Sequence, residues 1–330
     1  MRTAARAATA RGEAALREAS GLLGPDLIGD SAFGRVLDAA RGLPGGHMAE
    51  VLELRLGDRA SDIDLSRVWL PGAFDRLARE VRRRADFAPL TGLLDAVGRL
   101  GARPSVIWLE RDAGRDASPT PSVFLAPPPP YHTREGVRLV QVLHAAGLVD
   151  AGARRAAEGI LQHLPEGAHP RQIGVMTGRC PAALRLVIAL PERADLVPLV
   201  GSAPDRHATA HGLVALAEGI AGPRRLHLDL TGEGDGPGPC IGLEIGTVSA
   251  DPARTEATLW RLAERGVASA AKARALTAAA APRSLGDACD ALPCGFRLSH
   301  FKLSAAVGTV PEAKVYGMIA PQLGMMPATV

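Results

Sequence analysis

Five pairs of strand-like segments recur along this 330-residue chain, and a short polar or Gly/Pro-rich turn joins the two members of each pair. Apolar and polar residues alternate within the segments, which is the pattern of a β-strand with two different faces. A short turn between consecutive strands indicates an antiparallel hairpin. The five expected hairpins comprise residues 51–56 with 62–69, 105–110 with 122–126, 172–176 with 184–190, 225–230 with 240–245, and two runs within 299–320.

Helical segments are expected between these hairpins. Apolar residues recur there at spacings of three and four, as in Leu139, Val142 and Leu143, which is typical of one face of an α-helix. The chain therefore repeats a helix-strand-strand-helix unit, and hairpins at intervals of roughly 50 to 70 residues indicate a closed or stacked array. The expected helical segments span residues 73–100, 133–164, 196–220 and 252–280.

Closure is the simplest way for ten antiparallel strands to bury both edges of their sheet. We therefore expect an α+β protein, a ten-stranded antiparallel β-barrel of repeated α-β-β-α units with the helices outside. Residues 1–45 are predicted to form an N-terminal helical segment and residues 46–330 the barrel domain. The alternative is an open sheet with helices on one face and water on the other.

The alternation also predicts which side chains each face carries. One set of rows is apolar and suits the helix-covered outside: Leu52, Leu54, Leu56, Leu184, Leu186, Ile188, Leu190, Leu226, Leu228, Leu230, Ile241, Leu243, Ile245, Phe301, Leu303, Val315 and Ile319. The opposite rows are polar and would line the lumen of a closed barrel: Glu53, Arg55, Asp62, Asp64, Arg185, His227, Asp229, Glu244, His300, Lys302, Lys314 and Tyr316.

Composition excludes several classes of function. A net charge of +3, with the basic residues dispersed, is too weak to indicate a nucleic-acid partner. No apolar stretch approaches the roughly 20 residues that span a bilayer, so we expect no membrane contact and a cytoplasmic protein. The four cysteines lack the spacing of a zinc site and are expected to be free thiols.

The repeated unit resembles the ABBA, or prenyltransferase-barrel, fold of aromatic prenyltransferases, from about residue 51 to residue 321. Two motifs carry this resemblance. Glu53 lies on the first strand, where the indole prenyltransferases keep a glutamate that accepts a proton from the aromatic substrate. Lys314-x-Tyr316 is similar to the family's Lys-x-Tyr strand pattern, in which lysine meets diphosphate and tyrosine shields the allyl cation.

Other positions depart from the family pattern. Its Arg-x-Lys-x-Tyr signature falls on Ala183, Arg185 and Val187, so one cation remains and the tyrosine does not. Asp62 and Asp64 stand near the place where the second strand usually brings an arginine to the diphosphate. With two tyrosines in all, the chain cannot build the usual tyrosine cage around a carbocation.

The resemblance implies a natural-product tailoring enzyme that transfers a prenyl group from a prenyl diphosphate to an aromatic small molecule or peptide. Glu53 would be the base, and burial among apolar walls would raise its pKa towards a useful range. The alternative for Glu53 is a salt bridge to Arg55 or to a cation on a neighbouring strand. Tyr316 would be a partial shield. The diphosphate, or another anion, would be bound by cations of the inward rows: Arg55, Arg185, His227, Lys302 and Lys314. Either no cofactor is required, or Mg²⁺ is held by Asp62 and Asp64.

Two further functions remain open at this point. In one, a barrel of the same fold has left prenyl transfer and uses its lumen for acid/base cyclisation or isomerisation of a natural product or modified peptide. The groups for that chemistry are His227 with Asp229, and His300 beside Lys302. Asp64 and Glu244 are further candidates in the lumen. In the other, the barrel binds a small molecule or peptide without catalysis.

Overall fold

The protein is described by a computed structural model. The described residues are 2–58, 63–114, 120–177, 183–191, 196–201, 203–220, 223–230, 237–246, 251–285 and 294–321.

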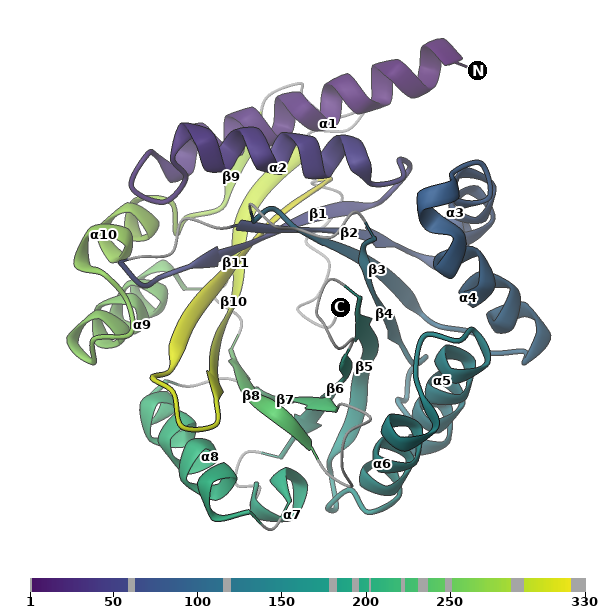
Figure 1. Cartoon of the computed structure of the whole chain (residues 1–330). Helices are drawn as coiled ribbons and strands as arrows, with labels where there is room; N and C mark the ends of the chain where they lie inside the picture. The colour runs from purple at the N-terminus through teal and green to yellow at the C-terminus, as the bar shows by residue number, and fades with distance from the viewer. Residues whose placement is uncertain are drawn as a thin grey trace.

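Ten strands form a closed antiparallel barrel, as the sequence predicts (Figure 1). Neighbours along the chain pair in order from β1 to β8, β8 pairs with β10, and β11 closes the ring by pairing with both β10 and β1. The open-sheet alternative is therefore wrong. The barrel strands are β1 Ala49–Arg55, β2 Ile63–Trp69, β3 Val106–Asp112, β4 Ser122–Ala126, β5 His169–Met176, β6 Ala183–Leu190, β7 Arg224–Leu230, β8 Pro237–Ile245, β10 Cys294–Ala306 and β11 Glu312–Pro321.

Helices surround the barrel on its outside (Figure 1). Short 3-10 turns, η1 Pro71–Ala73 and η2 Ala85–Phe87, precede two of them. The helices are α1 Arg2–Leu23, α2 Asp30–Gly42, α3 Phe74–Val81, α4 Ala88–Arg99, α5 Thr133–Ala145, α6 Ala151–Gln162, α7 Val197–Val200, α8 Pro204–Ala217, α9 Pro252–Glu264 and α10 Ala270–Ala278. In the described part of the chain, none of them is long and apolar enough to cross a membrane.

Each of the four predicted helical segments is a pair of helices rather than one. Between α5 and α6, Gly147 has a φ of 72° and Asp150 accepts a hydrogen bond from the Ala153 N–H, so the chain ends one helix and caps the next. Between α9 and α10, Gly266 has a φ of 71° and Ser269 caps α10. Left-handed glycines and capping side chains are therefore the physical reason for these two breaks.

The apolar rows face the helices and form the main core. Trp69, Phe87 and Phe296 are its largest fully buried side chains. Leu186 of β6 lies opposite Leu228 of β7, so the row continues from strand to strand beneath the helices. The predicted outward face is thus confirmed, and the polar residues that alternate with it are turned into the lumen.

A β-bulge at Ser299 keeps the inward row of β10 in phase. The pairing of β10 with β11 shifts between Leu298 and His300, which leaves Ser299 as the extra residue. Its hydroxyl lies 2.9 Å from His300 Nδ1 and donates to the Tyr316 carbonyl at 3.3 Å. His300 therefore lies opposite Tyr316, and Lys302 lies opposite Lys314.

One short strand and one disulfide were not predicted. Strand β9, Arg283–Leu285, adds to the edge of β10 beside Cys294. Cys294 is disulfide-bonded, whereas Cys240 is a free thiol. The prediction of free thiols is therefore wrong for Cys294, because sequence spacing alone does not reveal which cysteines the fold brings together.

Candidate functional site in the barrel lumen

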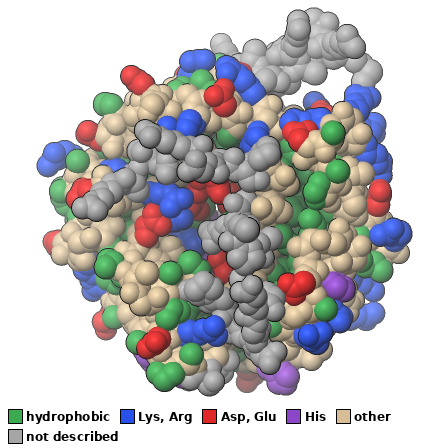
Figure 2. Space-filling view, in the orientation of Figure 1, with side chains coloured by type: hydrophobic (Ala, Val, Ile, Leu, Met, Phe, Trp, Pro, Cys, Tyr) green, Lys and Arg blue, Asp and Glu red, His purple; other side chains and the backbone are tan. Residues whose placement is uncertain are grey.

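Charged side chains gather inside the barrel (Figure 2), where acidic and basic groups are visible near the centre of the face. Of the predicted lumen residues, those buried by the surrounding strands are Glu53, Asp64, Arg185, His227, Asp229, Glu244, Lys302, Lys314 and Tyr316. Arg55 and His300 are partly exposed on the same rows. Asp62 lies outside the described residues.

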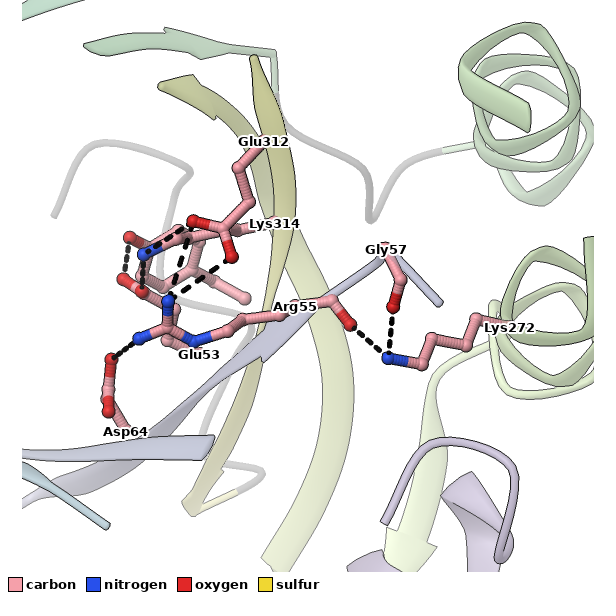
Figure 3. A network of polar contacts seen from close by, with 8 residues as sticks. Glu53, Arg55, Gly57, Asp64, Lys272, Glu312 and Lys314 are labelled. Carbon is pink, nitrogen blue, oxygen red and sulfur yellow. Dashed lines mark hydrogen bonds and ion pairs between the residues drawn. The ribbon is translucent and has the colours of Figure 1, made fainter. Parts of the chain in front are cut away.

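Glu53 lies at the centre of a small group of polar side chains on β1 and β11 (Figure 3). It is opposite Tyr316 in the strand register, and its carboxylate accepts hydrogen bonds from the Tyr316 hydroxyl and from Lys314 Nζ, the latter at 2.5 Å. Burial opposes the charge, but Lys314, Lys302 and the Tyr316 hydrogen bond together hold the pKa of Glu53 well below its usual range. Glu53 is therefore an ion-paired carboxylate in the unliganded protein.

This geometry corrects one expectation about Glu53. The sequence predicts that burial raises the pKa of Glu53 towards a useful range for a base, with a salt bridge to Arg55 or to a cation on a neighbouring strand as the alternative. The partner is Lys314 from the neighbouring strand β11, and burial is outweighed by Lys314, Lys302 and the Tyr316 hydrogen bond together, which lower the pKa of Glu53. The role of Glu53 as a base stays a prediction, and it requires Lys314 to be drawn away.

Arg55 bridges two carboxylates at the end of β1 (Figure 3). Its guanidinium donates to Asp64 Oδ2 at 3.2 Å and to Glu312 Oε1 at 3.2 Å. On the other side of β1, Lys272 of α10 donates from Nζ to the carbonyl oxygens of Arg55 and Gly57 at 2.9 and 2.8 Å. The strand end that carries Arg55 is thus fixed from outside the barrel.

Asp64 does not fit the predicted magnesium site. A guanidinium lies beside its carboxylate and would repel a dication there. Among the described residues, no group of three or more His, Cys, Asp or Glu side chains is arranged to hold a metal ion. With Asp62 outside the described residues, we derive no role for Mg²⁺ from this lumen.

Arg185 and Asp229 form a buried bidentate pair. Arg185 Nε and Nη2 donate to the two Asp229 carboxylate oxygens at 2.6 and 2.9 Å. Burial opposes the charge of Arg185, but Asp229 raises the pKa of the guanidinium, so it stays protonated. Ala183 and Val187, on either side of Arg185, place apolar side chains at the arginine and tyrosine positions of the family's Arg-x-Lys-x-Tyr signature.

Three basic side chains lie near the carboxylate of Glu244 on β8. Arg225 Nη1 donates to its Oε1 at 2.6 Å, His227 Nε2 lies 3.1 Å from its Oε2, and His300 Nε2 lies 3.9 Å away. Burial, reinforced by the Lys302 charge, lowers the pKa of His227 to about 3, so His227 is neutral and donates through Nε2. His300 also stacks on Tyr316, with ring centroids 4.1 Å apart.

Lys302 differs from the other described lumen cations because no described carboxylate forms an ion pair with it. Its side chain is 3% exposed, and no described residue makes a hydrogen bond or ion pair with it. Gly242 provides its space, since a Cβ there would lie 2.9 Å from Lys302 Cε. Burial and the charges of Arg185 and Lys314 lower the pKa of Lys302 to about 7.

Several lumen residues were not anticipated from the sequence. Glu110 of β3 faces the lumen and accepts a hydrogen bond from the Ser66 hydroxyl at 3.1 Å. Trp108 and Phe124 lie opposite each other on β3 and β4 and form part of an apolar wall. The alternation of residues 105–110 predicted the strand, and extending its inward row would have identified Trp108 and Glu110.

Known structures share the architecture of this chain, although its sequence is distant from theirs. No protein-family model matches the chain, and no curated protein matches it. Among solved structures, 5-dimethylallyltryptophan synthase from Streptomyces coelicolor is similar at 13% identity, with 93% of this chain and 96% of that chain covered and a TM-score of 0.58.

Two further structures agree in architecture. The prenyltransferase PriB, solved with L-tryptophan and dimethylallyl thiolodiphosphate, is similar at 14% identity, with 93% and 95% of the two chains covered and a TM-score of 0.59. NotF prenyltransferase is similar at 12% identity, with 82% and 80% covered and a TM-score of 0.52. At these identities the likeness establishes the fold alone. By its fold, the chain is an ABBA, or prenyltransferase, barrel.

Proposed function

We propose that this protein transfers a prenyl group from a prenyl diphosphate to an aromatic acceptor. The observation that carries the proposal is Lys302, a buried ammonium that forms no hydrogen bond or ion pair with any described residue and feels the charges of Arg185 and Lys314. A buried cation without a partner is costly. The diphosphate of the donor is the kind of ligand that would satisfy it, because its oxygens accept strong charge-assisted hydrogen bonds.

The reaction in this lumen would be an electrophilic aromatic substitution. The C–O bond of the donor breaks, and the diphosphate leaves with the electron pair into the field of Lys302 and Lys314. A ring carbon of the acceptor forms a bond to the allyl cation, and the ring proton passes to Glu53. Lys302 and Lys314 thus stabilise the negative charge that develops on the leaving group.

Lys314 links the two halves of this reaction. In the unliganded protein it is 2.5 Å from Glu53 Oε1 and weakens that carboxylate as a base. A bound diphosphate competes for the same ammonium. Glu53 then loses its counter-ion in a buried site, so its pKa rises when the donor is in place.

The lumen also offers aromatic and apolar surface to the reacting carbons. Tyr316, stacked on His300, lies next to Glu53 and would shield the allyl cation on one side. Trp108 and Phe124 offer π-faces on the opposite wall. This shield is smaller than the tyrosine cage of the family, so the acceptor itself would cover part of the cation.

A second function has an observation in its favour. Most lumen charges are already paired, as Arg185 is with Asp229 and Glu244 is with Arg225 and His227. Such a paired network suits acid/base cyclisation or isomerisation of a natural product or modified peptide, or ligand binding without turnover. Neither function needs a diphosphate.

The test is incubation with dimethylallyl, geranyl and farnesyl diphosphates and a panel of aromatic small molecules and peptides, with and without magnesium, read by mass spectrometry. The proposal expects one donor to give a product heavier by one prenyl group. K302M should abolish this product, and K302R, which keeps the charge, should retain part of it. No mass gain with any donor would contradict prenyl transfer.

A further inference from the structure

Lysine is rare in this chain, and each lysine is buried. The sequence contains 35 arginines but three lysines, Lys272, Lys302 and Lys314, and all three side chains are buried in the structure. Lys272 donates to two backbone carbonyl oxygens at the end of β1, and Lys314 pairs with Glu53. Lys302 is left without a hydrogen bond or ion pair from any described residue.

The carboxylate that lies opposite Lys302 does not neutralise it. In the strand register this carboxylate belongs to Glu244 of β8. Arg225 donates to its Oε1 at 2.6 Å, and His227 Nε2 lies 3.1 Å from its Oε2. The Lys302 side chain instead passes over Gly242, where a Cβ would lie 2.9 Å from Cε. Its Nζ is not one of the enclosed atoms that lack a partner, whereas His227 Nδ1 is, so Nζ faces open space in the lumen.

These surroundings favour the neutral amine of Lys302. Burial and the charges of Arg185 and Lys314 lower its pKa to about 7, although Glu53 and Asp229 act in the opposite direction. About half of the molecules therefore carry an uncharged amine at pH 7, compared with on the order of one in 10³ for an ordinary lysine. A buried amine beside other cations is the environment that activates a lysine as a nucleophile.

The use of lysine rather than arginine at position 302 supports the same conclusion. A guanidinium stays protonated in proteins and binds phosphate and carboxylate groups through a rigid fork of donors. A chain that uses arginine for nearly all of its positive charges could use it here too if charge were the sole requirement. Lysine adds the ability to lose a proton and attack a carbonyl carbon.

We propose that Lys302 forms an imine with an aldehyde or ketone that enters the lumen. The Nζ lone pair attacks the carbonyl carbon, a C–N bond forms, and the π-electron pair moves to the oxygen, which takes up a proton. The carbinolamine then loses water, so that both amine protons and the carbonyl oxygen leave together and a C=N bond replaces the C=O bond. No oxidant or reductant is needed. This activity goes beyond prenyl transfer and does not depend on it.

Reductive trapping tests the imine directly. Wild-type protein is incubated at pH 7 with benzaldehyde and sodium cyanoborohydride, which reduces an imine to a stable secondary amine, and peptide mass spectrometry identifies the labelled site. We expect a benzyl group on Lys302, formed roughly tenfold or more faster than on Lys272 or Lys314. The rate should level off as the benzaldehyde concentration rises, because binding in the lumen precedes the reaction. No label on Lys302, or equal labelling of the three lysines in the folded protein, would overturn the inference.

Unfolding provides the first control. In urea the three lysines have similar surroundings, so they should be labelled at similar rates. Labelling in urea that still selects Lys302 would show that the fold does not create the reactivity, and it would overturn the inference.

Two variants provide the second control. K302R keeps the charge and should lose the label, whereas K272R, which replaces a lysine outside the barrel, should keep it on Lys302. Thermal unfolding shows whether each variant is folded, and the wild-type peptide map decides the question if K302R is not. An unchanged amount of label in folded K302R would place the reactive amine elsewhere and overturn the inference.

A failure of prenyl transfer is distinguishable from a failure of this inference, because no prenyl diphosphate enters the trapping experiment. A selective imine at Lys302, together with no product from any prenyl diphosphate, would contradict the proposed function alone.

Discussion

Lys314 and Glu53 come from strands at opposite ends of the barrel sequence, and their side chains meet at 2.5 Å between Nζ and Oε1. The closing pair of strands, β1 with β11, creates this contact, because Arg55 lies opposite Lys314 and Glu53 opposite Tyr316. The pair holds a would-be base and a would-be diphosphate ligand in one ion pair. Donor binding and base strength are therefore coupled through a single ammonium group.

E53Q tests this coupling. The substitution removes the base, so turnover should fall by about 10²- to 10⁴-fold, the usual contribution of general base catalysis. It also removes the competitor for Lys314, so pyrophosphate should bind as tightly as to the wild type or more tightly. Calorimetry with pyrophosphate and a turnover assay measure the two effects. Weaker pyrophosphate binding in E53Q would contradict the competition.

The lowered pKa of Lys302 predicts that anion binding depends on pH. Its pKa of about 7 means that the ammonium is charged below pH 7 and neutral above it. Pyrophosphate should therefore bind more weakly as the pH rises from 6 to 8. K302R keeps its charge throughout this range, so its affinity should change less. A wild-type affinity that follows the K302R curve over this range would show that Lys302 does not titrate there.

Stability should also depend on pH through Lys302. In the unfolded chain this lysine titrates near its ordinary value of 10.5, so between pH 7 and 10.5 the unfolded state binds more protons than the folded state. Stability contributed by this group thus rises with pH across that window, and below pH 7 the full cost of the buried charge remains. K302M should be more stable than the wild type by about 1 kcal/mol or more below pH 7. Urea unfolding at several pH values should show this gain shrink towards pH 10.

The close approach of Gly242 to Lys302 predicts that a larger side chain at position 242 displaces the lysine. In G242A the new Cβ would lie 2.9 Å from Lys302 Cε and 3.1 Å from His227 Cβ, so Lys302 must shift. Overpacking of this kind costs typically about 1–3 kcal/mol, and pyrophosphate binding should weaken with it. G212A is the control, because no atom lies within 4 Å of a Cβ there. If G242A binds pyrophosphate as the wild type does, Lys302 is not held where the account needs it.

The sequence was sufficient for the barrel and for its two faces. Alternate residues of strands such as β6 and β7 face opposite sides of the closed barrel. The leucines must face the helices, and Arg185 and His227 must face the lumen. Gly147 and Gly266 end helices within two segments that apolar periodicity predicts as continuous. Helix boundaries depend on backbone conformation at single residues, and periodicity does not report it.

The pairing inside the lumen was beyond sequence reasoning. The contact of Glu53 with Lys314 depends on the register of β1 against β11, and that register has no local signal. The phase of β10 depends on the Ser299 bulge, which sets His300 against Tyr316. Those contacts lower the pKa of Glu53 although burial alone would raise it, so the raised pKa predicted from the sequence is wrong.

The most direct measurement counts released pyrophosphate and prenylated product in one reaction, with the best donor and acceptor of the panel. The account predicts equal amounts of the two from the wild type, and loss of both in K302M while thermal unfolding shows that the variant is folded. Pyrophosphate release without any prenylated product, or no release with any donor from folded wild-type protein, would contradict prenyl transfer in this lumen.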